Sequence, residues 1–426
     1  MNAEYNRLNK VLTQCGNKSI LGYSLKALIA SELVYLIYQR YKPFRQLHKI
    51  SLSTFFAQIS VAFNYQLLFE TCKQFKCILT VLHKREDHVE FMQQIQQQIP
   101  DSTIFYNHNI SLIRHFKLSH IVIAFYNIMP LRGLSLKEKI HIIIILIKYL
   151  NTLDHLEKLF KAFVPAMFKF VAFNGPYKND AILTEFFHKI KVPTFSIQHG
   201  IYYEYKSFIP YDIINYLFVN TDKILCWGKE SVRVLKKYRI EEKKLVIAGN
   251  PKYEDVEIKK INTNFKTGLV LLGRFIYHKE NISLLKVLKK IKTNTGIGFI
   301  IKPHPSLLSH KIWPAYLAIC NESNFEIQEK GLLTKILDSN QFDFSIAYNT
   351  GAYIESYIFG KVSLRYSINE NETVEGIDDK FLNESEFEER ISYFKNKASD
   401  ELNKDIFQMV DDVFGITKIN YKAYLN

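Results

Sequence analysis

Short apolar stretches that each end in a polar or glycine-containing cluster recur along this chain and alternate with segments of helical spacing. In the first half, "FKFVAFN" (168–174), "PTFSIQHG" (193–200) and "KLVIAGNP" (244–251) follow this pattern. In the second half, "GFIIKPHP" (298–305) and "DFSIAYN" (343–349) repeat it. Uniformly apolar strands separated by helices predict parallel sheets covered on both faces. Ligands of open parallel sheets bind at the carboxyl ends of the strands, where the polar clusters of this chain fall.

The length of the chain, 426 residues, exceeds what one ordinary core needs. Residues 250–268 have no apolar period and predict a linker between two α/β series. We therefore expect an α/β fold of two tandem Rossmann-like domains that face each other across a cleft. Residues 1–255 would form the N-terminal domain and residues 266–384 the C-terminal domain. Helices over 385–426 are candidates to pack back on the first domain.

Three further segments of the first half carry local patterns. "SLKALIASELVYLIYQRY" (24–41) has helical spacing, whereas "SHIVIAFYN" (119–127) predicts a strand. Residues 136–163 have helical spacing again and predict one long helix or two.

The most apolar stretch, "HIIIILIKYL" (141–150), falls well short of the roughly 20 residues that cross a bilayer. No signal-peptide pattern follows the N-terminus, so we expect a cytoplasmic protein. Five cysteines without a C-x-x-C pair lack zinc-ligand spacing and argue against a disulfide framework.

Charge is distributed unevenly along the chain. Residues 1–170 hold 21 Lys and Arg against 10 Asp and Glu, a net charge of +11, whereas the remainder carries only +3. A basic first half predicts an anionic partner such as a membrane surface or an acidic polymer, and a general bias toward lysine is the alternative. Basic residues are not interleaved with aromatic ones in any motif for nucleic acid, so we expect no nucleic-acid partner.

Several strand ends of the second half carry groups suited to a phosphate. In "KPHP" (302–305) the prolines stiffen the strand exit and orient the imidazole between them. In "NTGAYIES" (349–356) a hydroxyl precedes a helix start whose free N–H groups favour an anion. The alternatives are a rigid strand exit and an ordinary capped helix. The residues predicted to bind a ligand with a phosphate and a ribose are Arg274, Lys302, His304, Pro305, Asn349, Thr350, Gly351 and Glu355.

In the first half, "QHGIYYE" (198–204) follows an apolar strand directly. His199 is either a chemical group at the edge of the sheet or only the residue that ends the strand. On the first interpretation His199 is a candidate for proton transfer, with Glu204 in reserve. The other residues predicted to line the cleft on this side are Asn174, Gly175, Gln198, Gly200, Tyr202 and Tyr203.

Three common motifs are missing from the sequence. It contains no G-x-x-x-x-G-K-[ST], no G-x-G-x-x-G after a strand and no D-x-D that would place a divalent metal on a diphosphate. Kinase, dinucleotide oxidoreductase and metal-dependent functions therefore lose support, and we predict no metal-binding residues.

The ordered set "SIQHG", "CWG", "GNPKYED", "LLGRF", "KPHP" and "NTGAYIESYIFGK" resembles bacterial glycosyltransferases of the GT-B fold that build capsule and lipopolysaccharide chains. This resemblance covers roughly residues 165–365. The second half is also similar to polymerases that transfer alditol phosphates from CDP-activated donors and to bacterial sialyl- and polysialyltransferases, although the acidic base motif of the latter has no counterpart here. "RFIYHKEN", "NTGAYIES" and "NETVEGI" resemble hydrolysing UDP-N-acetylglucosamine 2-epimerases, whose N-terminal Arg-Pro-Glu motif is missing.

The resemblance implies a division of labour between the domains. The second would hold a UDP-, CMP- or CDP-activated sugar, with His304, Thr350 and Gly351 at the phosphates and Glu355 at the ribose. The first would meet an oligosaccharide or lipid-linked glycan acceptor, with His199 as base. No cofactor is implied, and the enzyme would work as a peripheral protein on the inner face of the cell membrane. The alternatives are an alditol-phosphate transferase, a UDP-N-acetylglucosamine 2-epimerase-like enzyme and a non-catalytic nucleotide-sugar binding protein.

Overall fold

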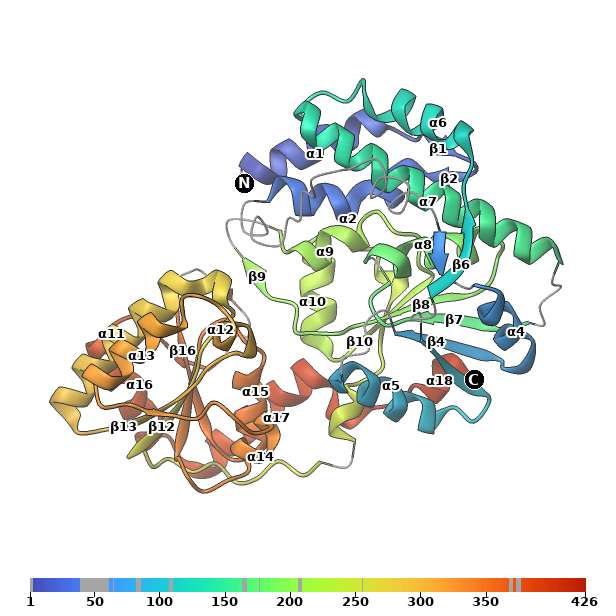
Figure 1. Cartoon of the computed structure of the whole chain (residues 1–426). Coiled ribbons are helices and arrows are strands. Elements are labelled where there is room, and N and C mark those ends of the chain that lie inside the picture. The colour runs from blue at the N-terminus through green and yellow to red at the C-terminus, as the bar shows by residue number, and fades with distance from the viewer. Residues whose placement is uncertain are drawn as a thin grey trace. The chain divides into compact units, whose positions relative to one another are not determined.

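The chain forms two compact units (Figure 1). The first comprises residues 1–254 and 417–426, and the second comprises residues 255–416. The computed structural model describes residues 3–38, 61–63, 65–81, 86–106, 110–162, 167–175, 177–205, 209–254, 256–367, 371–372 and 377–426.

A six-stranded parallel sheet is the centre of the first unit, with the order β5-β4-β7-β8-β10-β11. Its strands are β4 (Cys77–Val81), β5 (Ser102–Tyr106), β7 (Lys169–Ala172), β8 (Thr194–Ile197), β10 (Lys223–Cys226) and β11 (Leu245–Ile247). Numbered along the chain, this order is 2-1-3-4-5-6, so the winding direction reverses between β4 and β7. Both β4 and β8 are buried over their whole length, as strands covered on both faces require.

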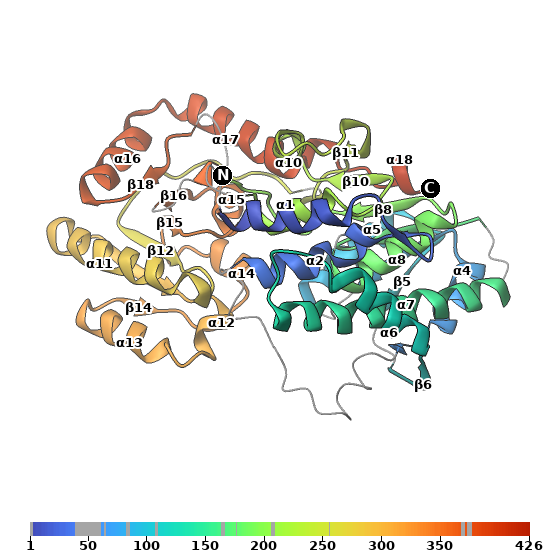
Figure 2. The same cartoon turned by 90° about the horizontal axis from the view of Figure 1, so that it is seen from above.

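Helices cover this sheet, and Figures 1 and 2 show α1, α2, α6 and α7 gathered into a separate helical layer. The helices are α1 (Ala3–Cys15), α2 (Leu25–Ile37), α4 (Gln66–Gln74), α5 (Glu86–Gln98), α6 (Leu118–Ile128), α7 (Leu136–Ala162), α8 (Lys178–Lys189), α9 (Tyr211–Tyr216), α10 (Lys229–Lys237) and α18 (Lys422–Leu425). Two antiparallel pairs accompany them: β1 (Ser19–Ile20) with β2 (Tyr23–Ser24), and β3 (Val61–Phe63) with β6 (Ile110–His115). A shared apolar core joins this layer to α8.

Residues 119–127 lie in helix α6, so the strand predicted there is wrong. One side of this helix, with Ala124 and Ile128, is buried, while Val122 and Tyr126 on the other side are exposed. Because both sides are apolar, the segment has no period that would distinguish a helix from a strand. By contrast, residues 136–162 form the single long helix α7, one of the two arrangements predicted.

The second unit contains another six-stranded parallel sheet, with the order β14-β13-β12-β15-β16-β18. Its strands are β12 (Thr267–Leu271), β13 (Gly298–Lys302), β14 (Glu326–Ile327), β15 (Phe344–Ala347), β16 (Val362–Tyr366) and β18 (Lys380–Phe381). Along the chain this order is 3-2-1-4-5-6, which is the order of dinucleotide-binding Rossmann sheets. The winding direction therefore reverses between β12 and β15.

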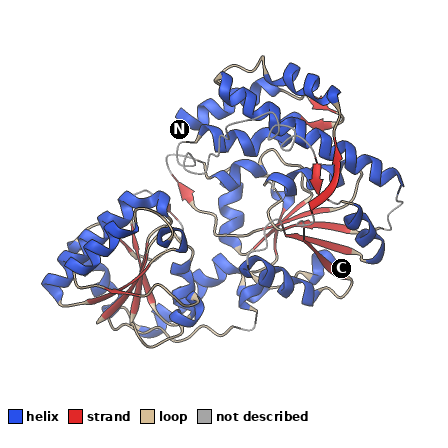
Figure 3. Cartoon of the chain, in the orientation of Figure 1, coloured by secondary structure: helices blue, strands red, loops and turns tan. Residues whose placement is uncertain are grey.

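Helices lie on both sides of the second sheet (Figure 3). They are α11 (His278–Thr295), α12 (Pro305–Leu308), α13 (Trp313–Glu322), α14 (Leu333–Leu337), α15 (Ala352–Ile358), α16 (Glu384–Asn396) and α17 (Ser399–Phe414). Of the segment predicted to return to the first domain, α16 and α17 belong to the second unit, and residues 417–426 belong to the first. The hydroxyl of Tyr421 donates a hydrogen bond to the carbonyl of Gly249 at 2.9 Å, which fixes the chain end in the first unit.

Two tandem Rossmann-like units confirm the predicted α/β fold class of GT-B type. None of the helices that the structure describes has the length and apolar character needed to span a membrane.

Candidate functional site

The carboxyl ends of β12 and β15 lie side by side at the point where the second sheet reverses its winding direction. Open α/β sheets bind ligands in the crevice formed at such a point. The turn after β12 begins with Gly273 and Arg274, and the turn after β15 begins with Tyr348 and Asn349. These two turns, joined by the one after β13, form the candidate donor site.

Gly273 is required where these turns meet. A Cβ atom at this position would lie 3.0 Å from the carbonyl oxygen of Tyr348 and 3.2 Å from the ring of Tyr277. Asn281, fully buried on α11, accepts a hydrogen bond from the Gly273 N–H and donates one to its carbonyl, both at 3.0 Å. The turn is therefore held on both sides, which leaves its position little freedom when a ligand binds.

His304 occupies the N-cap of α12, where its ring orientation is fixed by hydrogen bonds. Its Nδ1 accepts from the backbone N–H of Ser306 at 3.1 Å and lies 2.9 Å from the Ser306 hydroxyl. A neutral ring that accepts at Nδ1 carries its proton on Nε2, which can donate to a phosphate. The same hydroxyl accepts from the backbone N–H of Phe275 at 3.3 Å, so it ties the turns after β12 and β13 together.

The two cations predicted at this edge have different surroundings. Arg274 is exposed, and no side chain or carbonyl in the described part of the chain pairs with its guanidinium. Lys302 instead donates through Nζ to the carbonyl of Glu329 at 2.7 Å, and burial lowers the pKa of its ammonium. Arg274 therefore remains available for an anionic ligand, whereas Lys302 is already bonded to the segment that follows β14.

Beyond β15, Asn349 has a φ of +47°, in the left-handed region that Asn tolerates better than most residues. This turn directs the chain into α15, and the hydroxyl of Thr350 accepts from the backbone N–H of Ala352 at 3.4 Å. Gly351 is the N-cap of α15, and half-buried Glu355 lies one turn into the helix. The structure thus brings this turn and Arg274 to neighbouring strand ends of one sheet.

In the first unit, aromatic rings gather at the carboxyl ends of the strands. Phe173, just after β7, has its ring centroid 4.4 Å from that of His88 and 6.1 Å from that of His199. His199 follows β8, and His88 lies in α5, the helix after β4. The reversal point of this sheet lies between β4 and β7, so His88 and Phe173 flank it. His88 was not predicted as a site residue.

The turn after β7 is fixed by a close contact with β8. The N–H of Gly175 donates to the hydroxyl of Ser196 at 2.9 Å, and a Cβ at Gly175 would lie 2.7 Å from the Ser196 side chain. The Oδ1 atom of the preceding Asn174 is buried and accepts no hydrogen bond from any described residue. An acceptor held in this way can receive a hydrogen bond from a ligand hydroxyl.

Asp180, in the first turn of α8, contacts the backbone of this turn, and its side chain is buried, with the residue 1% exposed. Its carboxylate accepts hydrogen bonds from the backbone N–H of Asn174 and the hydroxyl of Thr80, each at 3.4 Å. Burial outweighs these two bonds and raises the pKa of Asp180 to about 7. Asp180 therefore supports the turn that carries Asn174, and the carboxyl group of Asp180 changes its charge near neutral pH.

Gln198 and Gly200 lie next to His199 and hold the loop that carries it through a hydrogen bond between them. Gln198 is fully buried, donating to the carbonyl of Gly200 and accepting from the N–H of Trp227, both at 2.8 Å. It therefore fixes the turn that carries His199. A Cβ at Gly200 would meet nothing within 4 Å, so no close approach of another group explains this glycine.

The aromatic and acidic residues that follow lie deeper in the unit. Tyr202 is 3% exposed and packs edge-on against Tyr216 in an apolar core, while Tyr203 is half-buried. Glu204, at the start of β9 (Glu204–Tyr205), is also buried and is ion-paired with Arg233 at 3.0 Å and with Lys237. A carboxylate neutralised by two cations is a weak proton acceptor, which favours a structural role for Glu204.

Asn281, Ser306 and His88 are the residues of these edges that sequence reasoning missed. Asn281 and Ser306 act through backbone groups of other turns, and His88 is near Phe173 only because β4 and β7 are adjacent in the sheet. The one available signal was for Ser306, which follows the "KPHP" motif directly.

Comparisons with known proteins give structural neighbours without a family assignment. No family model matches the chain, and no curated protein matches it significantly. The chain is similar to the Neisseria meningitidis UDP-GlcNAc 2-epimerase bound to UDP-GlcNAc, with 15% identity and a TM-score of 0.46 over 80% of this chain and 96% of that one. It is also similar to the Methanocaldococcus jannaschii UDP-GlcNAc 2-epimerase in complex with UDP-GlcNAc and UDP. The identity is 13% and the TM-score is 0.45, over 76% of this chain and 93% of that one.

A third neighbour is the lipopolysaccharide outer core galactosyltransferase WaaB in its apo form. Identity is 10% and the TM-score is 0.47, over 82% of this chain and 97% of that one. Scores at this level carry no argument about activity. The fold class rests on the strand order of the two sheets.

Proposed function

We propose that this chain is a glycosyltransferase that transfers a sugar from a nucleotide-activated donor to a growing surface polysaccharide of the capsule or lipopolysaccharide type. The observation that carries the proposal is the carboxyl edge of the second sheet. There the guanidinium of Arg274, which pairs with none of the described residues, an oriented imidazole and an Asn-Thr turn follow three adjacent strands, two of which flank the reversal point. Such an edge suits a ligand with a phosphate and a ribose.

The proposed reaction is a displacement at the anomeric carbon of the donor sugar. The bond from this carbon to the phosphate oxygen breaks, and a bond to the acceptor oxygen forms. Negative charge develops on the departing phosphate, where Arg274 and the Nε2–H of His304 would stabilise it. Glu355 would accept hydrogen bonds from the ribose, and no metal ion takes part in the proposed step.

The acceptor hydroxyl loses a proton in the same step, and His199 is proposed to receive it. Gln198 fixes the loop that carries this imidazole, and the ring of Phe173 lies beside it. Such restraint supports the role of a base, because proton transfer needs a fixed donor–acceptor geometry. Asn174, whose Oδ1 atom accepts no hydrogen bond from the residues that the structure describes, is proposed to orient an acceptor hydroxyl.

A ligand panel tests the donor assignment: thermal shift and calorimetry with UDP, CDP, CMP, GDP and their sugar conjugates. We expect one nucleotide to stabilise the protein and His304→Ala to weaken its binding about tenfold or more, because a hydrogen bond to a charged phosphate is lost. His188→Ala, an exposed histidine on α8, is the control. Lack of binding to every nucleotide would refute the proposal. Consumption of UDP-N-acetylglucosamine without an acceptor would favour an epimerase, and transfer of an alditol phosphate would favour that polymerase class.

A further inference from the structure

Helix α6 has an exposed face made of apolar side chains. Leu118, Val122, Phe125 and Tyr126 are 73%, 69%, 54% and 79% exposed. Their spacing of three, four and eight residues places them on one side of a helix. The eleven residues "LSHIVIAFYNI" include no Lys, Arg, Asp or Glu. Exposed apolar surface of this kind marks an interaction site more often than ordinary protein surface.

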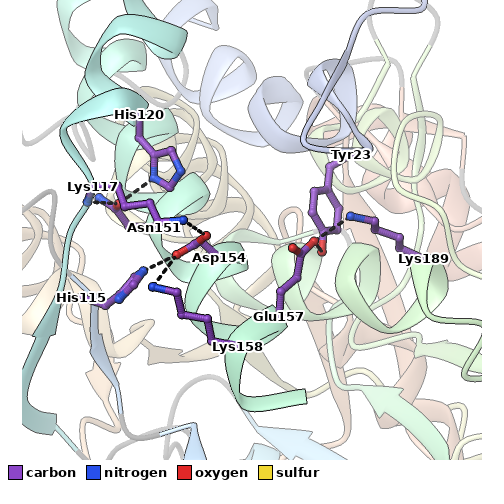
Figure 4. Close-up of polar contacts among 9 residues, drawn as sticks. All are labelled: Tyr23, His115, Lys117, His120, Asn151, Asp154, Glu157, Lys158 and Lys189. Atoms are coloured by element: carbon purple, nitrogen blue, oxygen red, sulfur yellow. Dashed lines mark hydrogen bonds and ion pairs between the residues drawn. The ribbon is translucent and has the colours of Figure 1, made fainter. Parts of the chain in front are cut away.

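The opposite side of α6 is fixed to α7 by polar contacts (Figure 4). Buried His120 lies with Nδ1 2.7 Å from Oδ1 of Asn151, and the same oxygen accepts from the backbone N–H of Lys117 at 3.0 Å. Burial lowers the pKa of His120, which favours the neutral ring in the core. The rotation of α6 about its axis is therefore set by these contacts, and its apolar face is directed away from α7.

A second group of contacts holds the start of α6. Asp154 on α7 pairs with His115 at 2.5 Å, with Lys158 at 3.4 Å and with Lys117 (Figure 4). Burial alone would raise the pKa of Asp154, but the hydrogen bonds from Lys117 and His115 lower it to about 2. The carboxylate is thus ionised and neutralised at physiological pH, and it leaves no uncompensated negative charge beside the helix.

The turn from α6 into α7 adds both apolar and basic groups. Leu136 and Ile140 are 62% and 43% exposed, and Arg132 and Lys137 are exposed beside them in sequence. The acid in this stretch, Glu138, pairs with Arg7 of α1 at 2.6 Å. The apolar side chains therefore have the positive charges of Arg132 and Lys137 near them in sequence. The acidic residue of this stretch, Glu138, is already paired with Arg7.

We propose that α6 and the first turn of α7 dock on an anionic lipid bilayer. The apolar side chains would enter the boundary between headgroups and acyl chains, and Arg132 and Lys137 would contact the acidic headgroups. A second copy of the chain fits this face less well, because a two-fold contact would place its positive charges near their own copies. The inference goes beyond the proposed function, since it concerns neither donor nor acceptor chemistry.

Vesicle flotation tests the inference without measuring transfer. The full chain is mixed with vesicles of phosphatidylcholine alone, or of equimolar phosphatidylcholine and phosphatidylglycerol. We expect binding to the anionic vesicles that weakens with salt. Val122→Ser and Phe125→Ser should each lower the partition coefficient about tenfold, because each removes an inserted apolar group. Arg132→Gln and Lys137→Gln should each lower it about fivefold.

Matched controls come from exposed residues of the second unit. Phe407→Ser on α17, where the side chain is 45% exposed, and Lys335→Gln on α14 should leave vesicle binding unchanged. Unchanged far-ultraviolet circular dichroism would show that the α6 variants fold. The inference is overturned if the wild-type chain ignores anionic vesicles or if the serine variants bind as well as it does. It is also overturned if sedimentation shows a dimer that Val122→Ser dissociates and no vesicle binding accompanies it.

Discussion

The carboxyl edges of the two sheets differ in what they present to a ligand. In the second unit the edge carries an exposed cation, Arg274, and a histidine oriented through Nδ1, His304. In the first unit the edge is aromatic, with His88 and His199 beside the ring of Phe173, and it is supported by buried Asp180. The edge of the second sheet offers a positive charge to an anion. The edge of the first sheet places two half-buried imidazole rings beside an aromatic ring.

This difference is consistent with the proposed function, in which each of the two similar sheets would supply one part of the reaction. A phosphate binds through exposed cations and N–H donors, which need little support beyond the turn that carries them. A base needs a fixed position and a controlled environment, which require buried neighbours. The four predictions that follow test this division, in order of decreasing effect.

Replacing the proposed base should have the largest effect. His199→Gln is expected to lower kcat by about 10²- to 10⁴-fold with little change in nucleotide affinity, because it removes the proton acceptor alone. Steady-state transfer assays and nucleotide calorimetry on the same preparation measure both quantities. Glu204→Gln is the comparison, and its kcat should stay within a few fold because Arg233 and Lys237 already hold this carboxylate. A large loss of kcat in Glu204→Gln, together with a normal kcat in His199→Gln, would show that Glu204 is the base and that His199 is not.

Asp180 should make the stability of the protein depend on pH. Its pKa of about 7 in the folded state lies above the ordinary value, so the folded chain binds this proton more tightly than the unfolded chain does. Its contribution to stability is complete below about pH 4 and is lost as the pH rises through about 7, at about 1.4 kcal/mol per pH unit between these values. The free energy of unfolding, measured with urea from pH 5 to pH 8, should show this slope up to about pH 7 and level off above it.

The control for this effect is Asp180→Asn, which cannot ionise. The unfolding free energy of the wild type should then fall steadily relative to that of the variant from pH 5 to pH 7, by about 1.4 kcal/mol per pH unit. A difference that stays constant with pH would contradict the raised pKa of Asp180.

Two glycines predicted together as cleft residues should respond differently to substitution. Gly175→Ala is expected to destabilise the protein by about 2 kcal/mol, because the new Cβ would lie 2.7 Å from Ser196. Gly200→Ala should change the unfolding free energy by less than about 0.5 kcal/mol, since its Cβ would enter open space and its φ is not positive. Chemical denaturation of both variants checks the comparison, and equal destabilisation would show that Gly175 is not held by this contact.

The smallest effect is expected at the exposed cation of the second unit. Arg274→Gln should weaken nucleotide binding about tenfold, or about 1.4 kcal/mol, and leave the melting temperature unchanged, because no described residue pairs with its guanidinium. Lys279→Gln, an exposed cation in the first turn of α11, is the matched control and should bind nucleotide normally. If both variants lose affinity equally, the loss reflects general charge and not a contact at the strand end.

The sequence predicted the elements whose period is unambiguous. The strands before Asn174, His199 and His304 were predicted because a short, largely apolar stretch precedes a cluster that contains glycine or proline. Residues 119–127 were assigned to a strand because an apolar segment with β-branched residues carries no period of its own. Its helical state depends on polar contacts with α7, and the exposed apolar face became visible only with that helix.

The candidate sites were predictable to a similar extent. Local sequence determined which residues follow a strand, and it therefore placed Arg274, His304, Asn349 and His199 at the carboxyl ends of parallel strands. Only the tertiary structure decided which strand ends are neighbours, that Lys302 and Glu204 are engaged by other groups, and that Asn281 and His88 support or flank the edges. The physical reason is that strand order and side-chain pairing depend on contacts between residues far apart in the chain. Apolar periodicity and strand-end motifs, by contrast, are properties of a few consecutive residues.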